Sequence, residues 1–376
     1  MSASGGVCLP VLSSIIEAIA ELAPWDLAEN WDQVGLQVGK KNKVCNKVLV
    51  SLDYNQQTFA EGLGLQVDGF IVHHPLIFKP LKRLTDETET ERLATGLLKK
   101  DLFLIAAHTN VDKARRGLNQ YLAERFELEN IKPLDIAEPN SYKVVVFTPE
   151  SSVATLREAM AQAGAGTIGD YQQCSFELPG TGTFMPGNNA RPFIGNQGVF
   201  ERTPEIRLEM IAEKRCLAGV IQAINETHPY QEPAFDIFPL ANPSLDCLGR
   251  IGSLTQSVSL EEFCHMVKNR LSCKDIRVAG DLFRPIKRVA LCAGSGGNLL
   301  FKAISAQADL YLTGELNYHA FITARENGLA VIAAGHWGTE HFFADLITDY
   351  LNIYFKSEKN FEAIKGKRQE EPYLTF

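Results

Sequence analysis

The sequence lacks the features of a disulfide-stapled or membrane-spanning protein. Its eight cysteines are scattered over 376 residues without any Cys-x-x-Cys pair, which argues against a disulfide framework and against a thiolate zinc site. No stretch is long and apolar enough to span a bilayer, and residues 1–10 do not combine a positive region with an apolar one. These observations predict a cytoplasmic chain with reduced thiols and no membrane partner.

Clustered positive charge is also missing. The formal net charge is -8, the isoelectric point is about 5.6, and Lys and Arg form no concentrated block. Because binding to nucleic acid requires clustered cations that neutralise phosphates, nucleic acid is disfavoured as the main partner. An apolar content of 45% and a charged content of 22% are typical of a globular protein, and the length allows two or three domains.

Apolar runs and amphipathic segments alternate in the first part of the chain. We expect helices over 11–22, 56–64 and 89–100, and strands over 47–53, 68–73 and 103–108. This order is typical of βαβ units, so it predicts an α/β core with a mostly parallel sheet and helices on both faces. Right-handed crossovers then bring the carboxyl ends of the strands to one edge, where such sheets bind ligands. A C-terminal helix is expected over 339–355.

The segment 141–242 has a different character. It opens with a strand over 142–147 and a helix over 152–161, continues through a β-rich stretch punctuated by glycines, and closes with a helix near 216–225 and an apolar run. Two successive βαβ patterns predict an α+β, ferredoxin-like domain. Because core strands lie on both sides of it, we interpret it as an insertion. The predicted domains are therefore 1–140, 141–242 and 243–376.

The chain has only eight histidines, and two of them are adjacent at the end of an apolar run. His73 and His74 follow residues 68–72 and precede Pro75, which is compatible with a turn. Neighbouring residues on a strand point to opposite faces, so both imidazoles can serve one site only if the strand ends between them. Taken alone, the pair fits hydrogen-bonded packing residues as well as metal ligands.

Two further imidazole–carboxylate pairs occur just after predicted strands. His108 and Asp112 follow the run 103–107, and His336 and Glu340 follow the run 329–335. A spacing of four residues places both side chains on one face if the segment is helical, and a loop can also bring the two together. Three strand ends that each deliver a pair of potential ligands favour a metal site over three separate packing arrangements.

The ligand types indicate which metals fit. The set contains nitrogen and oxygen donors without thiolates, which suits Zn, Fe, Mn, Co or Ni and argues against calcium. Six candidates exceed one tetrahedral centre, so we predict two divalent metal ions roughly 3.5–4 Å apart, bridged by Glu340 or Asp112. The candidates are His73, His74, His108, Asp112, His336 and Glu340. For His108, orienting Asp112 is an alternative to binding metal.

Such a metal pair favours hydrolysis, because it lowers the pKa of a bound water towards about 7 and polarises a carbonyl, amidine or phosphoryl group. Glu315 and His319 are candidates for proton transfer, with orientation of a ligand and lining of a cleft as their alternatives. The glycine-rich segment 294–297 fits an anion loop or, at least equally, a tight turn. We interpret Trp31 as a packing anchor rather than a substrate platform, and Asp32 as a turn cap.

Five motifs together resemble the NIF-three-like family, whose bacterial members are often labelled GTP cyclohydrolase 1 type 2 homologues. They run in the family order along nearly the whole chain. The motifs are Trp31-Asp32-x-Val-Gly-Leu, His73-His74-Pro75-Leu-Ile-Phe-Lys-Pro-Leu-Lys, His108-Thr-Asn-x-Asp112, Gly294-Ser-Gly-Gly297 and Gly335-His336-x-x-x-Glu340.

The resemblance implies an α/β core that carries a di-metal site, and a homohexamer shaped as a hollow toroid. Its metal ligands carry over onto His73, His74, Asp112, His336 and Glu340, with His108 matching a residue nearby. The insertion resembles the CutA- and PII-like domain of longer bacterial members. Two residues depart conservatively from the family pattern: Trp337, where Tyr is usual, and Glu315, where Asp is common.

The resemblance leaves two functions open. The cyclohydrolase label implies hydrolytic attack on the imidazole carbon of a purine, and thus a metal-dependent hydrolase acting on a small molecule such as a nucleotide. The alternative is a non-enzymatic metal-binding or regulatory protein, in which the inserted domain senses a small molecule or contacts a partner.

Overall fold

The computed structural model describes residues 10–135, 140–169, 171–242, 244–358, 360–367 and 371–374. The chain divides into two compact units, and the first combines Met1–Ile136 with Leu245–Phe376. We call this the core unit, and we call Ala137–Ser244 the inserted unit. None of the helices in the described ranges is long and apolar enough to cross a membrane.

The first sheet of the core unit has a parallel centre. Its strands, in spatial order, are β1 (Gly35–Val38), β4 (Phe103–Ala106), β3 (Gly69–Val72), β2 (Lys47–Ser51) and β15 (Glu362–Lys365). Strands β4, β3, β2 and β15 are parallel, whereas β1 pairs with β4 in the antiparallel sense. β15 is a strand that the sequence pattern did not predict.

Helices cover both faces of this sheet. They are α1 (Leu12–Leu22), α2 (Gln56–Leu65), α3 (Glu89–Lys99) and α12 (Phe343–Tyr354). Alternate strand residues face opposite ways, so one face packs against α1 and α12 and the other against α2 and α3. The start of α3 is fixed by a capping box between Thr88 and Glu91, which typically contributes about 1 kcal/mol.

A second sheet forms the other half of the core unit. Its strands, in spatial order, are β11 (Arg277–Ala279), β14 (Ala330–Ala333), β13 (Leu310–Thr313), β12 (Pro285–Cys292), β10 (Arg250–Ser259) and β5 (Glu129–Pro133). The middle strands β12, β13 and β14 are parallel, and the outer pairings are antiparallel. The helices of this half are α5 (Leu118–Arg125), α8 (Leu260–Leu271), α9 (Leu300–Ser305) and α10 (Tyr318–Glu326).

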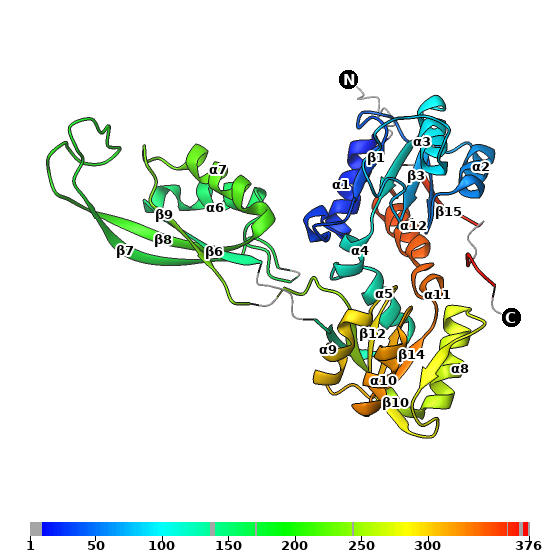
Figure 1. Ribbon diagram of the computed structural model, residues 1–376. Helices are drawn as coiled ribbons and strands as arrows, with labels where there is room; N and C mark the ends of the chain where they lie inside the picture. Colours follow the sequence, from blue (N-terminus) through cyan, green and yellow to red (C-terminus); the bar gives the residue numbers. More distant parts are fainter. Residues whose placement is uncertain are drawn as a thin grey trace. The chain divides into compact units, whose positions relative to one another are not determined.

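The expected single sheet is therefore two sheets, although the mixed α/β class is confirmed. One hydrophobic cluster contains residues from both sheets, from α1, α5 and α8, and from α12. Periodicity identifies strands but not their pairing partners, so it does not reveal where one sheet stops and another begins. In Figure 1 the short helices α4 (Thr109–Lys113) and α11 (His336–Glu340) lie between the two halves.

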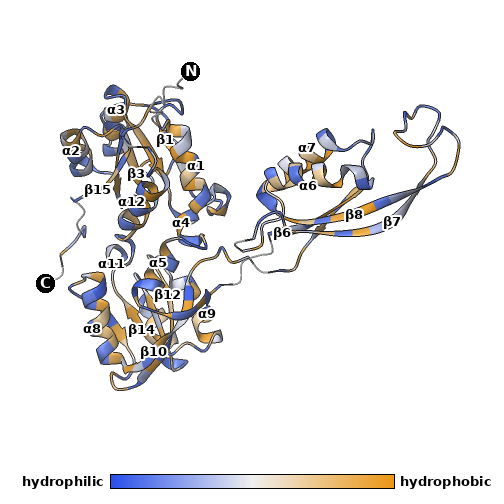
Figure 2. Cartoon of the chain, turned by 180° about the vertical axis from the view of Figure 1, so that it is seen from behind, coloured by the Kyte–Doolittle hydropathy of each residue, from blue (hydrophilic) through white to orange (hydrophobic). Residues whose placement is uncertain are grey.

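The expected C-terminal helix over 339–355 is also wrong at its start. The chain forms α11 first and begins α12 only at Phe343. The end of α11 therefore holds Glu340 at 3% exposure, between the two sheets. Figure 2 shows that the central strands of the core unit are predominantly hydrophobic, as strands covered on both faces are.

The inserted unit has one antiparallel sheet in the order β7-β8-β6-β9. Its elements are β6 (Ser141–Thr148), α6 (Val153–Gln162), β7 (Ser175–Phe184), β8 (Glu201–Glu213), α7 (Leu217–Thr227) and β9 (Phe235–Pro239). Both helices pack on one face of the sheet through a separate hydrophobic cluster. This βαββαβ connectivity is the one that the sequence pattern indicated.

Candidate metal centre

The adjacent histidines share one site because β3 ends before them. The strand stops at Val72, and the backbone amides of His73 and His74 both donate to the carbonyl of Leu52, at 3.1 and 3.0 Å. The strict alternation of strand side chains therefore no longer applies, and the two imidazole centroids lie 5.1 Å apart. His73 is fully buried, whereas the side chain of His74 is 28% exposed.

The second pair follows β4. His108 is the residue just before α4, and its ring centroid lies 5.0 Å from that of His73 and 5.5 Å from that of His74. One turn later, the same helix carries Asp112, which is buried. The carboxyl ends of β3 and β4 are in register, with Val72 opposite Ala106, and this register brings the two pairs together.

The third pair comes from the other sheet. β14 ends at Ala333, and Gly335 then adopts a φ of +84°, which favours glycine and turns the chain into α11. His336 and Glu340 lie on one face of this helix, with Nε2 of His336 2.8 Å from Oε2 of Glu340. The site thus lies where strand ends of both sheets meet.

Glu340 is at the centre of the cluster. Its Oε2 lies 3.0 Å from Nε2 of His74 as well as 2.8 Å from Nε2 of His336, whereas its Oε1 lies 3.9 Å from Nε2 of His73. Oδ1 of Asp112 lies 3.6 Å from the same Nε2 of His73. Ligand atoms within 4.8 Å of one another form two groups, one of His73, His74 and His108 and one of His74, His336 and Glu340.

Two buried atoms of the cluster indicate that these residues fit a metal. Within the described part of the chain, Nε2 of His73 and Oδ1 of Asp112 have no hydrogen-bond partner. A buried polar atom without a partner typically costs about 1–3 kcal/mol. Both atoms are metal-ligating types, and they face each other across 3.6 Å, a separation suited to a shared cation.

The outer nitrogens of three histidines are held by oxygen acceptors. Nδ1 of His73 lies 3.0 Å from the carbonyl oxygen of Ala107, and Nδ1 of His74 lies 2.8 Å from Oδ1 of Asp53. Nδ1 of His108 lies 2.9 Å from Oδ1 of Asp32. Such acceptors fix ring orientation, and here each leaves the Nε2 side available to the cluster.

Asp32 and Asp53 contact the histidines of the cluster, and sequence reasoning did not assign them to the site. Asp32 does accept a hydrogen bond from the amide of Gln33, as a turn cap would, but its other contacts are to His108 and Thr109. Asp53 follows the end of β2, so the strand-end argument applied to the histidines would have found it. Asp32 lies outside the parallel strands and carried no such signal.

The electrostatics of the cluster are strongly perturbed. Burial lowers the pKa of His73 to about 3, so its imidazole is neutral at pH 7, as a metal ligand must be. Burial also disfavours the charged form of His74, but hydrogen bonds to Asp53 and Glu340 outweigh it and raise its pKa to about 10. Burial and the nearby charge of Glu340 raise the pKa of Asp112 well above its usual value.

The glycine-rich segment after β12 packs against Glu340 and is a tight turn. The amide of Gly294 donates to Oγ1 of Thr339 at 3.0 Å, and the amide of Gly296 donates to Oγ1 of Thr313 at 3.1 Å. With these amides bonded to protein, they do not point at an anion. Gly294 has a φ of +64°, and a Cβ there would collide with Oε1 of Glu340. The glycine therefore leaves the space that this carboxylate occupies.

The two proposed proton-transfer residues differ in position. Oε1 of Glu315 lies 3.4 Å from Nδ1 of His336, and its side chain is 49% exposed. His319 is exposed in the first turn of α10 and contacts the ring of Tyr318. Among the contacts between described residues, none joins His319 to the cluster. The structure thus brings Glu315 to the cluster but not His319.

Trp31 is not the buried packing anchor that we expected. Its side chain is 57% exposed, and its ring lies 6.2 Å from that of His108 and 6.0 Å from that of Phe78. Phe78 is 45% exposed. The two rings form an accessible aromatic surface beside a candidate metal ligand, because Asp32 holds His108 next to them.

Comparison with known proteins gives one consistent result. Residues 10–372 match the family described as Duf34/NIF3 (NGG1p interacting factor 3). A GTP cyclohydrolase 1 type 2 homolog from Halalkalibacterium halodurans is 35% identical over 363 residues, which cover 96% of this chain and 97% of that protein. One from Bacillus subtilis is 37% identical over 325 residues, covering 86% and 87%. The crystal structure of a Bacillus cereus protein related to NIF3 superposes with a TM-score of 0.86 at 34% identity, covering 98% of this chain and all of that one.

Proposed function

Because the chain belongs to the Duf34/NIF3 family, and because its histidines and carboxylates converge between two sheets, we propose that it is a metal-dependent hydrolase with a dinuclear centre. The observation that carries the proposal is the pair of partnerless buried atoms, Nε2 of His73 and Oδ1 of Asp112, opposite one oxygen of Glu340. The other oxygen of Glu340 serves His74 and His336. Glu340 would then bridge two divalent ions.

The residues would divide between the two ions according to which oxygen of Glu340 they face. His73 and Asp112, with His108 beside them, would hold one ion, and His74 and His336 would hold the other. Zn, Fe, Mn, Co and Ni fit this nitrogen and oxygen set. When bound, the ions would supply Lewis acidity and lower the pKa of a water towards neutrality.

The remaining polar groups would orient the histidines and transfer protons. Glu315 contacts Nδ1 of His336 and is half exposed, so its carboxylate can exchange a proton with a bound substrate or with solvent. Asp53 and Asp32 hold the rings of His74 and His108 in fixed orientations. His319 is exposed at the start of α10, where it would transfer protons to a substrate that extends beyond the cluster.

The substrate class follows from the surroundings of the cluster. Trp31 and Phe78 offer exposed aromatic faces beside His108, which suit a planar heterocycle. The label of the bacterial relatives, GTP cyclohydrolase 1 type 2 homolog, is compatible with a heterocyclic substrate such as a nucleotide. The reaction would be addition of water to an electron-poor ring carbon or to another polarised group.

Turnover by the reconstituted protein tests this proposal. Protein loaded with Mn, Fe or Zn should hydrolyse a member of a panel of nucleotides and related heterocycles. Glu340→Gln should abolish the activity, and Trp31→Ala should raise KM more than it lowers kcat. A panel in which Glu340→Gln leaves every rate unchanged would contradict the proposal.

The second candidate function is a metal-binding regulatory protein without turnover. The inserted unit supports it, because the resemblance to PII- and CutA-like domains is accompanied by a cavity of about 1000 Å³ in this unit. A sensor would bind a ligand there without consuming a substrate at the metal centre. The homohexamer implied by the resemblance is compatible with both functions, and light scattering should give about six times the chain mass of 41.6 kDa.

A further inference from the structure

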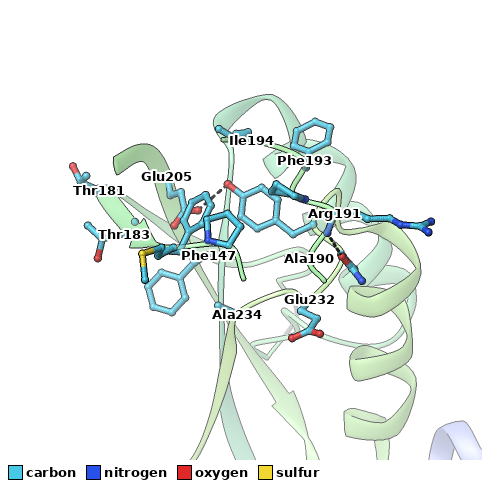
Figure 3. Close-up of a pocket in the computed structure, with 18 of the residues that line it drawn as sticks. Phe147, Thr181, Thr183, Ala190, Arg191, Phe193, Ile194, Glu205, Glu232 and Ala234 are labelled. Carbon is cyan, nitrogen blue, oxygen red and sulfur yellow. Dashed lines mark hydrogen bonds between the residues drawn. The ribbon is translucent and has the colours of Figure 1, made fainter. Parts of the chain in front are cut away.

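One cavity of the structure is built entirely from the inserted unit. It has a volume of about 1000 Å³, at the upper end of the roughly 300–1,000 Å³ of small-molecule sites. The end of the β7–β8 hairpin, the loop 185–194 and the segment 230–234 enclose it (Figure 3). None of these residues takes part in the candidate metal centre.

Four aromatic side chains line the cavity. The ring of Tyr230 lies 6.5 Å from that of Phe184 and 6.1 Å from that of Phe193, and Phe147 also lines the cavity. Phe193 is 60% exposed, and the neighbouring Met185 is 64% exposed. Exposed apolar groups that line a concave site favour an apolar ligand body, and faces of aromatic rings also attract cations.

A fixed carboxylate faces this aromatic wall. The hydroxyl of Tyr230 donates to Oε1 of Glu205 at 2.8 Å. A Cβ at Gly182 would collide with Oε2 of Glu205, so the glycine in β7 makes room for this carboxylate across the hairpin. The bond to Tyr230 orients the group, and the second oxygen accepts no hydrogen bond from Tyr230. A negative charge is thus held in place beside aromatic faces.

The two arginines that line the cavity, Arg191 and Arg207, do not pair with Glu205. Arg207 donates to Glu209 at 2.8 Å and lies over the ring of Phe147 at 5.5 Å. Figure 3 shows Arg191 on the opposite side of the pocket from Glu205, with its side chain extending away from it. The cavity therefore offers an oriented carboxylate for a ligand but no free guanidinium close to that carboxylate.

We propose that this cavity binds a small organic cation, an amine or quaternary ammonium group attached to an apolar or aromatic body. Phe184, Phe193 and Tyr230 contact the body and the face of the cation, and Glu205 neutralises its charge. Cation recognition by aromatic faces together with a carboxylate is the chemistry that this lining matches. The proposal is independent of turnover at the metal centre.

Methyl NMR on the full-length protein tests the proposal. Met185 lines the cavity, and Met266 packs in the core unit, so ¹³C-methyl methionine labelling supplies both a reporter and an internal reference. The probes are benzyltrimethylammonium, benzenesulfonate and benzyl alcohol, which have similar bodies and charges of +1, -1 and 0. We expect a saturable shift of the Met185 methyl with the cation at an affinity at least about tenfold above that of either other probe.

Two variants and a control locate the site. Glu205→Gln keeps an acceptor for Tyr230 but removes the charge, so it should weaken the cation about tenfold and leave benzyl alcohol unchanged. Phe193→Ala, at an exposed position, should weaken all probes that bind. The control is Glu177→Gln, because Glu177 pairs with Arg157 at 3.0 Å and does not line the cavity. The proposal is overturned if Met185 shows no saturable shift, if benzenesulfonate binds as well as the cation, or if Glu205→Gln changes nothing.

Discussion

Oε2 of Glu340 lies 3.0 Å from Nε2 of His74, although 266 positions separate the two residues in the sequence. The contact joins the end of α11, which follows the second sheet, to the end of β3 in the first. The other oxygen of Glu340 faces His73 at 3.9 Å. One buried carboxylate thus connects both sheets and both groups of ligands.

We predict that Glu340→Gln loses metal but keeps its fold. Gln is nearly isosteric with Glu but lacks the charge that would bridge two cations, so the metal content should fall from the proposed two ions per chain to at most one. Metal bound only to the folded protein would stabilise the wild type by mass action, by about 2.7 kcal/mol at a hundredfold excess over Kd. That metal-dependent rise in Tm should shrink or disappear in the variant. Elemental analysis and thermal unfolding with and without Mn or Zn measure both effects.

Gly294→Ala should lower metal binding although it replaces none of the candidate ligands. The left-handed backbone of Gly294 costs a non-glycine residue roughly 1–2 kcal/mol, and the new Cβ would displace the carboxylate of Glu340. The matched control is Gly297→Ala, where the nearest atom to a new Cβ is Cδ2 of Leu316 at 4.0 Å. We expect lower stability and lower metal content for Gly294→Ala only. Equal metal content in the two variants would show that the close approach is unimportant.

Asp32→Asn should weaken metal binding through His108. The amide retains the shape of the side chain but removes the charge that holds Nδ1 of His108 at 2.9 Å. Loss of such an outer partner typically costs about 10–100-fold in metal affinity. Asp26→Asn, at an exposed position in the short 3-10 helix Trp25–Leu27, is the control. Competition titration with a chromogenic chelator measures the affinities, and identical values for both variants would contradict the role of Asp32.

Metal binding should release protons at neutral pH. Without metal, His74 has a pKa of about 10 and is protonated at pH 7, whereas His73, with a pKa of about 3, is already neutral. A metal ion on His74 must displace its proton, so the apparent affinity should rise by about tenfold per pH unit for each proton displaced between pH 6 and 8.

Calorimetry in buffers with different ionisation enthalpies counts these protons. Asp53→Asn should reduce the count, because Asp53 helps to raise the pKa of His74. Binding heats that do not depend on the buffer would contradict the prediction.

The sequence predicted the parts of the site that follow from local rules. His73, His108 and His336 all follow buried strands, and ligands of α/β proteins bind at the carboxyl ends of parallel strands. The residue types and their positions after apolar runs were therefore enough to predict that these histidines lie close together. The four-residue spacing of the two pairs was compatible with a helix or a loop, and the structure forms the helices α4 and α11 there. The adjacent His74 fits because β3 stops at Val72, as Pro75 suggested.

The rest depended on tertiary contacts that periodicity does not encode. Asp32 reaches His108 across 76 positions from a loop. The division of the strands into two sheets arises from pairings such as β10 with β12 and β5, which a pattern of apolar residues does not specify. The exposure of Trp31 similarly depends on what packs beside it, and an isolated aromatic residue in a sequence does not reveal that.

The central claim is that one carboxylate bridges two metal ions, and anomalous diffraction from crystals of the metal-loaded protein tests it most directly. Data on both sides of the absorption edge of the loaded metal should show two separate peaks per chain. One should lie beside His73 and Asp112 and the other beside His74 and His336, with Glu340 between them. A single peak, or two peaks that Glu340 does not contact, would contradict the account.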